Sequence, residues 1–225
     1  MDFNLKLVLI QAPVILFALT IHEYCHGFVA NYLGDDTALR QGRLTLNPIA
    51  HLDVVGTILM FLVGFGWAKP VPVNPHNFKN PKKGMLLVAL AGPLSNLLTA
   101  ILAAQVLRYL IPSIIGSDQA VSGIYSTLLV VMVLTVIYGV GLAIFNILPI
   151  PPLDGSRVLY GLLPERQAYA YSRFEPYGIM ILFALFLFGG RAFSVVIWYP
   201  VSIITELISG LGYFQLWQII HYITG

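Results

Sequence analysis

Long apolar stretches separated by short polar ones set the pattern of this chain. They run from Leu5 to Leu33, from Met85 to about Ile111, and from Ile124 to about Leu148. A helix rises 1.5 Å per residue and the hydrocarbon core of a bilayer is about 30 Å thick, so each stretch is long enough to cross a membrane as a helix. The pattern therefore predicts at least three transmembrane helices.

The last third of the chain continues this pattern less regularly. Two apolar segments, Gly178–Gly189 and Ala192–Ile208, are separated by little more than Arg191, which predicts either two short spans or one long broken span. The tail from Tyr213 is aromatic and amphipathic, as expected at a membrane interface. The predicted fold class is an all-α integral membrane protein, a bundle of about five or six transmembrane or half-spanning helices with short extended or re-entrant segments.

The connection between the first two spans has features of its own. Residues 41–53 alternate in polarity and predict a short strand and turn, and residues 67–75 contain three prolines, which predict an extended segment. Residues 54–65 are apolar but too few for an ordinary span. Basic residues flank them on both sides: Arg40, Arg43, Lys69, Lys79, Lys82 and Lys83. A re-entrant element keeps all of these cytoplasmic, whereas a crossing separates them, so we favour re-entry.

Composition supports a membrane protein. Hydrophobic residues make up 58% of the chain, charged residues 10%, and the mean hydropathy is +0.83, whereas a soluble domain is about half apolar and a quarter charged. A net charge of +2 gives no reason to expect nucleic-acid binding. No repeat, charge tract or flexible linker divides the chain, so we expect a single membrane-embedded domain over residues 1–225.

A cluster of ionisable side chains lies inside the first apolar stretch, at the sequence His-Glu-Tyr-Cys-His of residues 22–26. Residues four apart share one face of a helix, so His22 and His26 can both direct imidazole nitrogens at one point. Glu23 is close enough to take a proton from a water on a metal held there. This H-E-x-x-H arrangement is typical of zinc hydrolases.

The depth of the motif in the membrane adds to this interpretation. His22 lies about 25 Å along the helix from Leu5 and about 16 Å before Leu33. The motif is therefore below the membrane surface, nearer the end of the helix that leads to the basic loops. Ionisable residues are costly at that depth, so the cluster is expected to be a functional site. Because the loops beyond this end of the helix are basic, the site is expected nearer the cytoplasmic side.

Two histidines leave a zinc site incomplete, so a third ligand is needed. The candidates are seven acidic and histidine side chains elsewhere in the chain: His51, Asp53, His76, Asp154, Glu165, Glu175 and His221. Asp154 follows an apolar run at a helix end broken by prolines, where a carboxylate can face an internal cavity. An ordinary Asp-Gly turn explains it equally simply, so spacing alone leaves the choice open.

Four motifs, taken together and in this order, resemble the site-2 protease family of intramembrane zinc metalloproteases. They are His-Glu-x-x-His-Gly at residues 22–27, Gly-Trp-Ala-Lys-Pro-Val-Pro-Val-Asn at 66–74, Gly-Pro-x-x-Asn at 92–96, and Asn-x-x-Pro-x-Pro-x-Leu-Asp-Gly at 146–155. The resemblance covers most of residues 18–178 and is strongest to small prokaryotic members. Inserted PDZ domains and appended CBS domains of other members do not fit this length, so we expect neither.

The resemblance implies the roles of individual residues. His22, His26 and Asp154 are expected to bind one Zn²⁺ per chain, and Glu23 to activate the attacking water. Asn96 and Asn146 match polar positions near the site and are candidates for stabilising the oxyanion or binding substrate.

The implied function is hydrolysis of peptide bonds in or near transmembrane segments of membrane-tethered proteins. The expected partners are a transmembrane-helix substrate and the lipid bilayer of the cell membrane, and the sequence carries no signal for an oligomeric state. Two alternatives use the same residues. A metal-ion transporter or channel would use the cluster as a transit site, but it would be expected to have further polar residues along a pore. An inactive relative would bind membrane helices as a scaffold, which the intact Glu23 disfavours.

Overall fold

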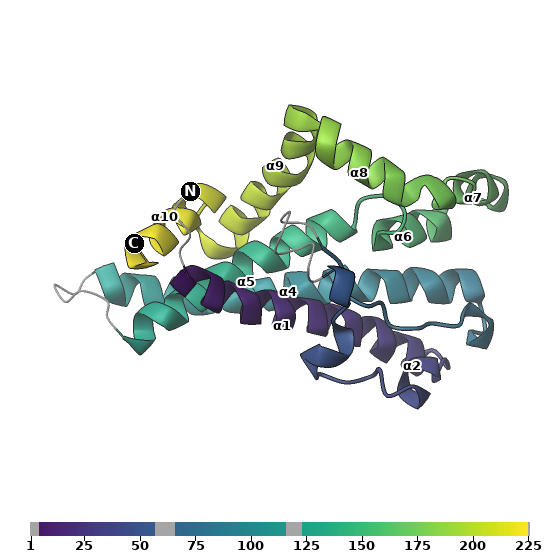
Figure 1. Ribbon diagram of the computed structural model, residues 1–225, viewed down its shortest axis with the longest axis horizontal. Helices are drawn as coiled ribbons and strands as arrows, with labels where there is room; N and C mark the ends of the chain where they lie inside the picture. The colour runs from purple at the N-terminus through teal and green to yellow at the C-terminus, as the bar shows by residue number, and fades with distance from the viewer. Residues whose placement is uncertain (1–4, 57–65, 116–122, 225) are drawn as a thin grey trace. The chain divides into compact units, whose positions relative to one another are not determined.

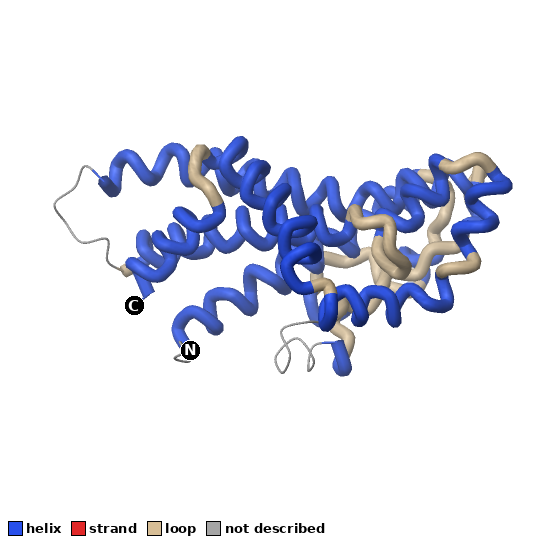
Figure 2. Tube along the Cα trace, turned by 90° about the horizontal axis from the view of Figure 1, so that it is seen from above, coloured by secondary structure: helices blue, strands red, loops and turns tan. Residues whose placement is uncertain are grey.

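The computed structural model describes residues 5–56, 66–115 and 123–224. Figure 1 shows its helices, and Figure 2 shows that these residues form helices joined by loops, with no strand among them. Three long helices correspond to the three predicted spans: α1 (Leu5–Tyr32), α4 (Pro81–Ile115) and α5 (Ile124–Asn146). The predicted all-α membrane fold is confirmed.

Shorter helices complete the described chain. They are α2 (Thr37–Arg40), α6 (Asp154–Leu162), α7 (Glu165–Ser172), α8 (Gly178–Phe188), α9 (Gly190–Ser209) and α10 (Tyr213–Thr224), with 3₁₀ turns η1 (Pro48–His51), η2 (Pro75–Asn77) and η3 (Glu175–Tyr177). Within the described residues, four helical stretches are long and apolar enough to cross a membrane: Lys6–Tyr32, Pro81–Ile111, Ile124–Asn146 and Glu165–Phe188, the last of which runs through α7, η3 and α8. A fifth span results if Ser194–Ser209 and Tyr213–Thr224, bent by 73°, are counted as one.

Two predictions about the first connection have different outcomes. The strand predicted within residues 41–53 is wrong: Pro48 and Asn47 start the 3₁₀ turn η1, because the Asn47 side chain accepts a hydrogen bond from Ile49 N at 3.1 Å. A single antiparallel bridge between Leu52 and Ala68 is all the β pairing in the described residues. The re-entrant prediction for 54–65 falls mostly on residues 57–65, which lie outside the described part.

Contacts divide the chain into two compact units that interleave along the sequence. The first unit comprises residues 1–18, 96–145 and 189–225. Its core packs aliphatic side chains of α4 and α5, including Leu107, Val133 and Leu134, against Leu216 and Ile220 of α10. The single-domain assignment for residues 1–225 stays a prediction.

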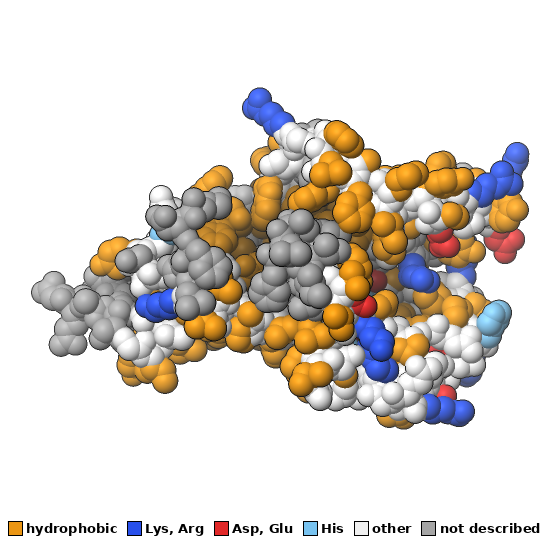
Figure 3. Space-filling view, viewed as in Figure 1, with side chains coloured by type: hydrophobic (Ala, Val, Ile, Leu, Met, Phe, Trp, Pro, Cys, Tyr) orange, Lys and Arg blue, Asp and Glu red, His pale blue; other side chains and the backbone are white. Residues whose placement is uncertain are grey.

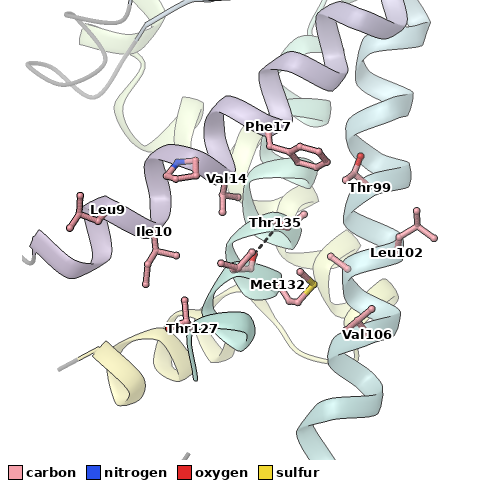
Figure 4. Close-up of a pocket in the computed structure, with 13 residues that line it drawn as sticks. Leu9, Ile10, Val14, Phe17, Thr99, Leu102, Val106, Thr127, Met132 and Thr135 are labelled. Atoms are coloured by element: carbon pink, nitrogen blue, oxygen red, sulfur yellow. Dashed lines mark hydrogen bonds between the residues drawn. The ribbon is translucent and has the colours of Figure 1, made fainter. Parts of the chain in front are cut away.

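The first unit also contains an apolar cavity of about 560 Å³. Side chains from the first half of α1, from α4 and from α5 line it, as Figure 4 shows. Phe17 and Leu102 on its wall are 49% and 61% exposed. Figure 3 likewise shows hydrophobic side chains over much of the visible face. Exposed apolar side chains on this scale are expected where a protein surface contacts lipid.

The second unit, residues 19–95 and 146–188, is held together partly by a buried carboxylate. Asp35, directly after α1, is fully buried and accepts hydrogen bonds from Asn74 N at 2.7 Å and from Asn77 Nδ2 at 2.6 Å. Thr37 donates through its N–H and its hydroxyl. Asp35 therefore ties the extended segment 67–74 to the end of α1.

Candidate metal centre

His22 and His26 lie one turn apart on α1 in the second unit. Both are buried, with 5% and 8% of their surface exposed, and their ring centroids are 4.6 Å apart. His26 Nδ1 lies 2.7 Å from the carbonyl oxygen of Val88. A carbonyl can only accept, so Nδ1 of His26 carries the proton and Nε2 is left as a lone-pair donor, as in many metal-binding histidines.

Asp154, the first residue of α6, brings a carboxylate oxygen to the same point. Its Oδ2 lies 3.0 Å from His22 Nε2 and 3.3 Å from His26 Nε2, and the three ligand atoms lie within 4.8 Å of one another. Oδ2 is buried yet makes no hydrogen bond of acceptable geometry. Ligand atoms bound tetrahedrally at zinc are separated by about 3.3 Å, given bonds of about 2.0–2.1 Å. The donor set and its spacing therefore fit a zinc ion.

Gly92 on α4 leaves the space that this group needs. A Cβ at this position would lie 2.5 Å from His26 Nε2 and 2.6 Å from His22 Nε2. Any side chain other than hydrogen would thus occupy the space beside both ligand nitrogens. The Gly-Pro-x-x-Asn motif of residues 92–96 therefore places helix backbone without a side chain beside the two histidines, which explains why its first residue is glycine.

The proline-rich connection after α5 positions Asp154. The chain turns within residues 147–153, where Ile150 N donates to Leu148 O at 2.8 Å and Leu153 N to Ile150 O at 2.9 Å. Gly155 packs against this turn so closely that a Cβ would lie 2.0 Å from Ile147 O. The Asp-Gly pair therefore lets α6 start directly against the preceding backbone, which directs the Asp154 carboxylate at the two histidines.

Glu23 has a backbone partner on the extended segment 67–74. Its Oε2 accepts a hydrogen bond of 2.8 Å from Val71 N, and the side chain is half-buried. The bond orients the carboxylate and leaves Oε1, together with the second lone pair of Oε2, open to other partners. No sequence pattern predicts this contact between Glu23 and Val71, although the alternating prolines around Val71 predict an extended backbone there.

Two of the other candidate ligands, His51 and Asp53, take structural positions. His51 is buried and its Nε2 donates to Thr45 O at 2.8 Å, while Asp53 accepts from Gly56 N at 2.8 Å, and neither belongs to the metal-binding group among the described residues. Asn146 is the last residue of α5, and Asn96 is a buried residue of α4 in the first unit. The roles expected of Asn96 and Asn146 stay predictions.

Several apolar spans and a His-His-Asp group that could hold a metal ion indicate a membrane-embedded metalloprotein. Sequence comparison then gives the family. The model of peptidase family M50 matches residues 109–189. The "Putative zinc metalloprotease YwhC" of Bacillus subtilis is 40% identical over 193 residues, which cover 82% of this chain and 83% of that protein. The "Putative zinc metalloprotease Rip2" of Mycobacterium tuberculosis is 30% identical over 190 residues, covering 81% and 70%.

The chain belongs to peptidase family M50, the site-2 protease family. No solved structure gives a significant match. The resemblance stated from the motifs is thereby confirmed, and the protein is an intramembrane zinc metalloprotease. The transporter and scaffold alternatives are not favoured.

Proposed function

We propose that His22, His26 and Asp154 hold one zinc ion per chain and that Glu23 is the general base of an H-E-x-x-H-type endopeptidase. The observation that carries this proposal is the convergence of two Nε2 atoms and one carboxylate oxygen, Asp154 Oδ2, which is buried without a hydrogen bond. A cation bound there would give this oxygen a partner besides the two imidazole nitrogens 3.0 and 3.3 Å away.

The chain's own groups then carry out the proton transfers. When bound, zinc would supply Lewis acidity that lowers the pKa of a coordinated water to about 7. The Glu23 carboxylate accepts the proton from the attacking water and returns it to the leaving amine. The bond from Val71 N to Oε2 holds the carboxylate in place throughout. Asn96 and Asn146 are proposed to donate to the oxyanion or to the substrate backbone.

The substrate class follows from the location of the site on a membrane-spanning helix. We propose that the protease cleaves membrane-tethered proteins in or near a transmembrane segment. Such a segment hides its carbonyls in helical hydrogen bonds, so it must unwind locally before Glu23 and the ligand group can act on it.

The site is proposed to face the cytoplasmic side. The C-terminal part of α1, the start of α4 and the connection that follows α5 belong to the second unit. Nine of the chain's 12 Lys and Arg residues lie in that unit: Arg40, Arg43, Lys69, Lys79, Lys82, Lys83, Arg157, Arg166 and Arg173. Basic residues favour the cytoplasmic side of membrane proteins, which supports the orientation.

The test is Glu23→Gln in the full-length protein, assayed for bound zinc and for cleavage of a co-expressed membrane substrate. The proposal predicts one zinc per chain and cleavage reduced by at least about 100-fold, because general acid–base catalysis contributes about 10²–10⁴. Glu165→Gln, an exposed acid at the start of α7, is the matched control and is expected to cleave normally. Cleavage by Glu23→Gln at the wild-type rate would refute the role of Glu23. Loss of zinc flux into proteoliposomes in this variant would instead favour a transporter.

A further inference from the structure

The proposed base is held by a single backbone amide between two prolines. Val71 N donates to Glu23 Oε2 at 2.8 Å, and Pro70 and Pro72 have no N–H to offer. Rotation or displacement of this short stretch would leave Glu23 without its donor. The orientation of the carboxylate therefore depends on whatever fixes the backbone at residues 69–71.

Two contacts fix that backbone. Lys69 N donates to His51 O at 2.8 Å, next to the Leu52–Ala68 bridge. Arg43 Nη2 donates to Lys69 O at 2.8 Å and to Pro70 O at 3.3 Å. Arg43 thus bonds the two carbonyls directly before Val71, at a place where prolines prevent a regular strand ladder.

The bonding of Arg43 differs from that of its neighbour Arg40. Arg40 is an exposed arginine whose side chain, 77% accessible, pairs with Asp36 on the same stretch of chain. Arg43 Nε is buried and makes no hydrogen bond, so this side chain loses the solvation of one donor while it reaches the two carbonyls. A residue that only marked the cytoplasmic side would need neither a buried Nε nor these two backbone hydrogen bonds.

We infer that Arg43 is a positioning residue for catalysis: through Lys69 O and Pro70 O it holds the Val71 amide against Glu23 and so fixes the orientation of the base. This inference rests on the proposed role of Glu23. The effect is expected on the chemical step and not on metal binding, because Arg43 donates to Lys69 O and Pro70 O and not to a residue of the metal-binding group. Misplacement of a catalytic group by about 1 Å costs on the order of 100-fold in rate.

The experiment compares Arg43→Ala, Arg43→Lys and the control Arg40→Ala, each as the full-length protein in detergent with a transmembrane peptide substrate. We expect Arg43→Ala to keep its zinc and a KM within about twofold of wild type while kcat falls about 10- to 100-fold. Arg43→Lys keeps a charged donor and is expected to recover part of kcat. Arg40→Ala is expected to match wild type.

A normal kcat in Arg43→Ala would overturn the inference, as would a loss confined to KM or one accompanied by loss of zinc. If Arg43→Ala does not fold, Arg43→Lys tests the inference instead. A geometric role of Arg43 predicts a reduced kcat at full zinc content, because lysine cannot reproduce the planar guanidinium. A wild-type kcat in Arg43→Lys would refute that role. Glu23→Gln is measured in parallel. Activity in that variant would show that the proposed base is wrong, whereas inactive Glu23→Gln with fully active Arg43→Ala would refute only the role of Arg43.

Discussion

Gly92→Ala is a direct test of the metal centre. The new Cβ would lie 2.5 Å from His26 Nε2 and 2.6 Å from His22 Nε2, whereas non-bonded atoms settle at about 3.5 Å or more. Each imidazole nitrogen, or the α4 backbone, must move by roughly 1 Å. A zinc site tolerates deviations of only about 0.2 Å in ligand distance. We therefore expect zinc affinity to fall by at least about 100-fold, the upper end of losses caused by displaced ligand orientation.

The substitution should not act by unfolding the helix. Replacing glycine by alanine in a helix interior stabilises it by about 1 kcal/mol, because glycine loses more backbone entropy on folding. Gly141→Ala on α5 is the matched control, since a Cβ there meets nothing within 4 Å. It is expected to retain zinc and activity and to melt at the same temperature or slightly higher.

The assay is zinc content per chain after dialysis against a weak chelator, with cleavage of a membrane substrate measured on the same preparation. Gly92→Ala should lose both, while its apo form melts within a few degrees of the wild-type apo form. If Gly92→Ala kept one zinc per chain and cleaved normally, His22 Nε2 and His26 Nε2 could not bind the metal at the position next to residue 92. The arrangement of ligands proposed above would then be wrong.

Two further predictions concern acidic residues of the second unit. Asp154→Ala should release zinc, whereas Asp53→Ala, which removes the acceptor for Gly56 N and lies outside the metal-binding group, should keep it; metal analysis of both variants checks this, and the reverse result would reassign the third ligand. Asp35→Asn should destabilise the protein by about 2–3 kcal/mol, because it replaces a charged acceptor of several buried hydrogen bonds. Burial raises the pKa of Asp35 but its hydrogen bonds lower it by more, so the net pKa is depressed. The stability that Asp35 contributes is then fully present above about pH 4 and is lost as the pH falls through the lowered pKa. The difference in melting temperature between wild type and Asp35→Asn should therefore shrink in acid, and a difference that grew would contradict the assignment.

The sequence by itself determined the spans and the two-histidine motif. Apolar runs of membrane length leave little choice of secondary structure, because an unsatisfied backbone group is too costly in lipid. The i, i+4 spacing of His22 and His26 is likewise local, so any helix over these residues puts both on one face. The family could be reached from such local patterns, and the comparisons confirm it.

Only the tertiary structure decided which distant residues meet these histidines. Spacing alone left Asp154 among several acids, and its 3.0 Å approach to His22 depends on how a proline-broken turn and Gly155 pack. The predicted strand within 41–53 failed for a local reason, the side-chain cap of Asn47, which polarity alternation does not register. The bond from Val71 to Glu23 joins residues 48 positions apart. Backbone contacts of this kind leave almost no trace in residue type, so the arrangement that holds the proposed base became visible only in three dimensions.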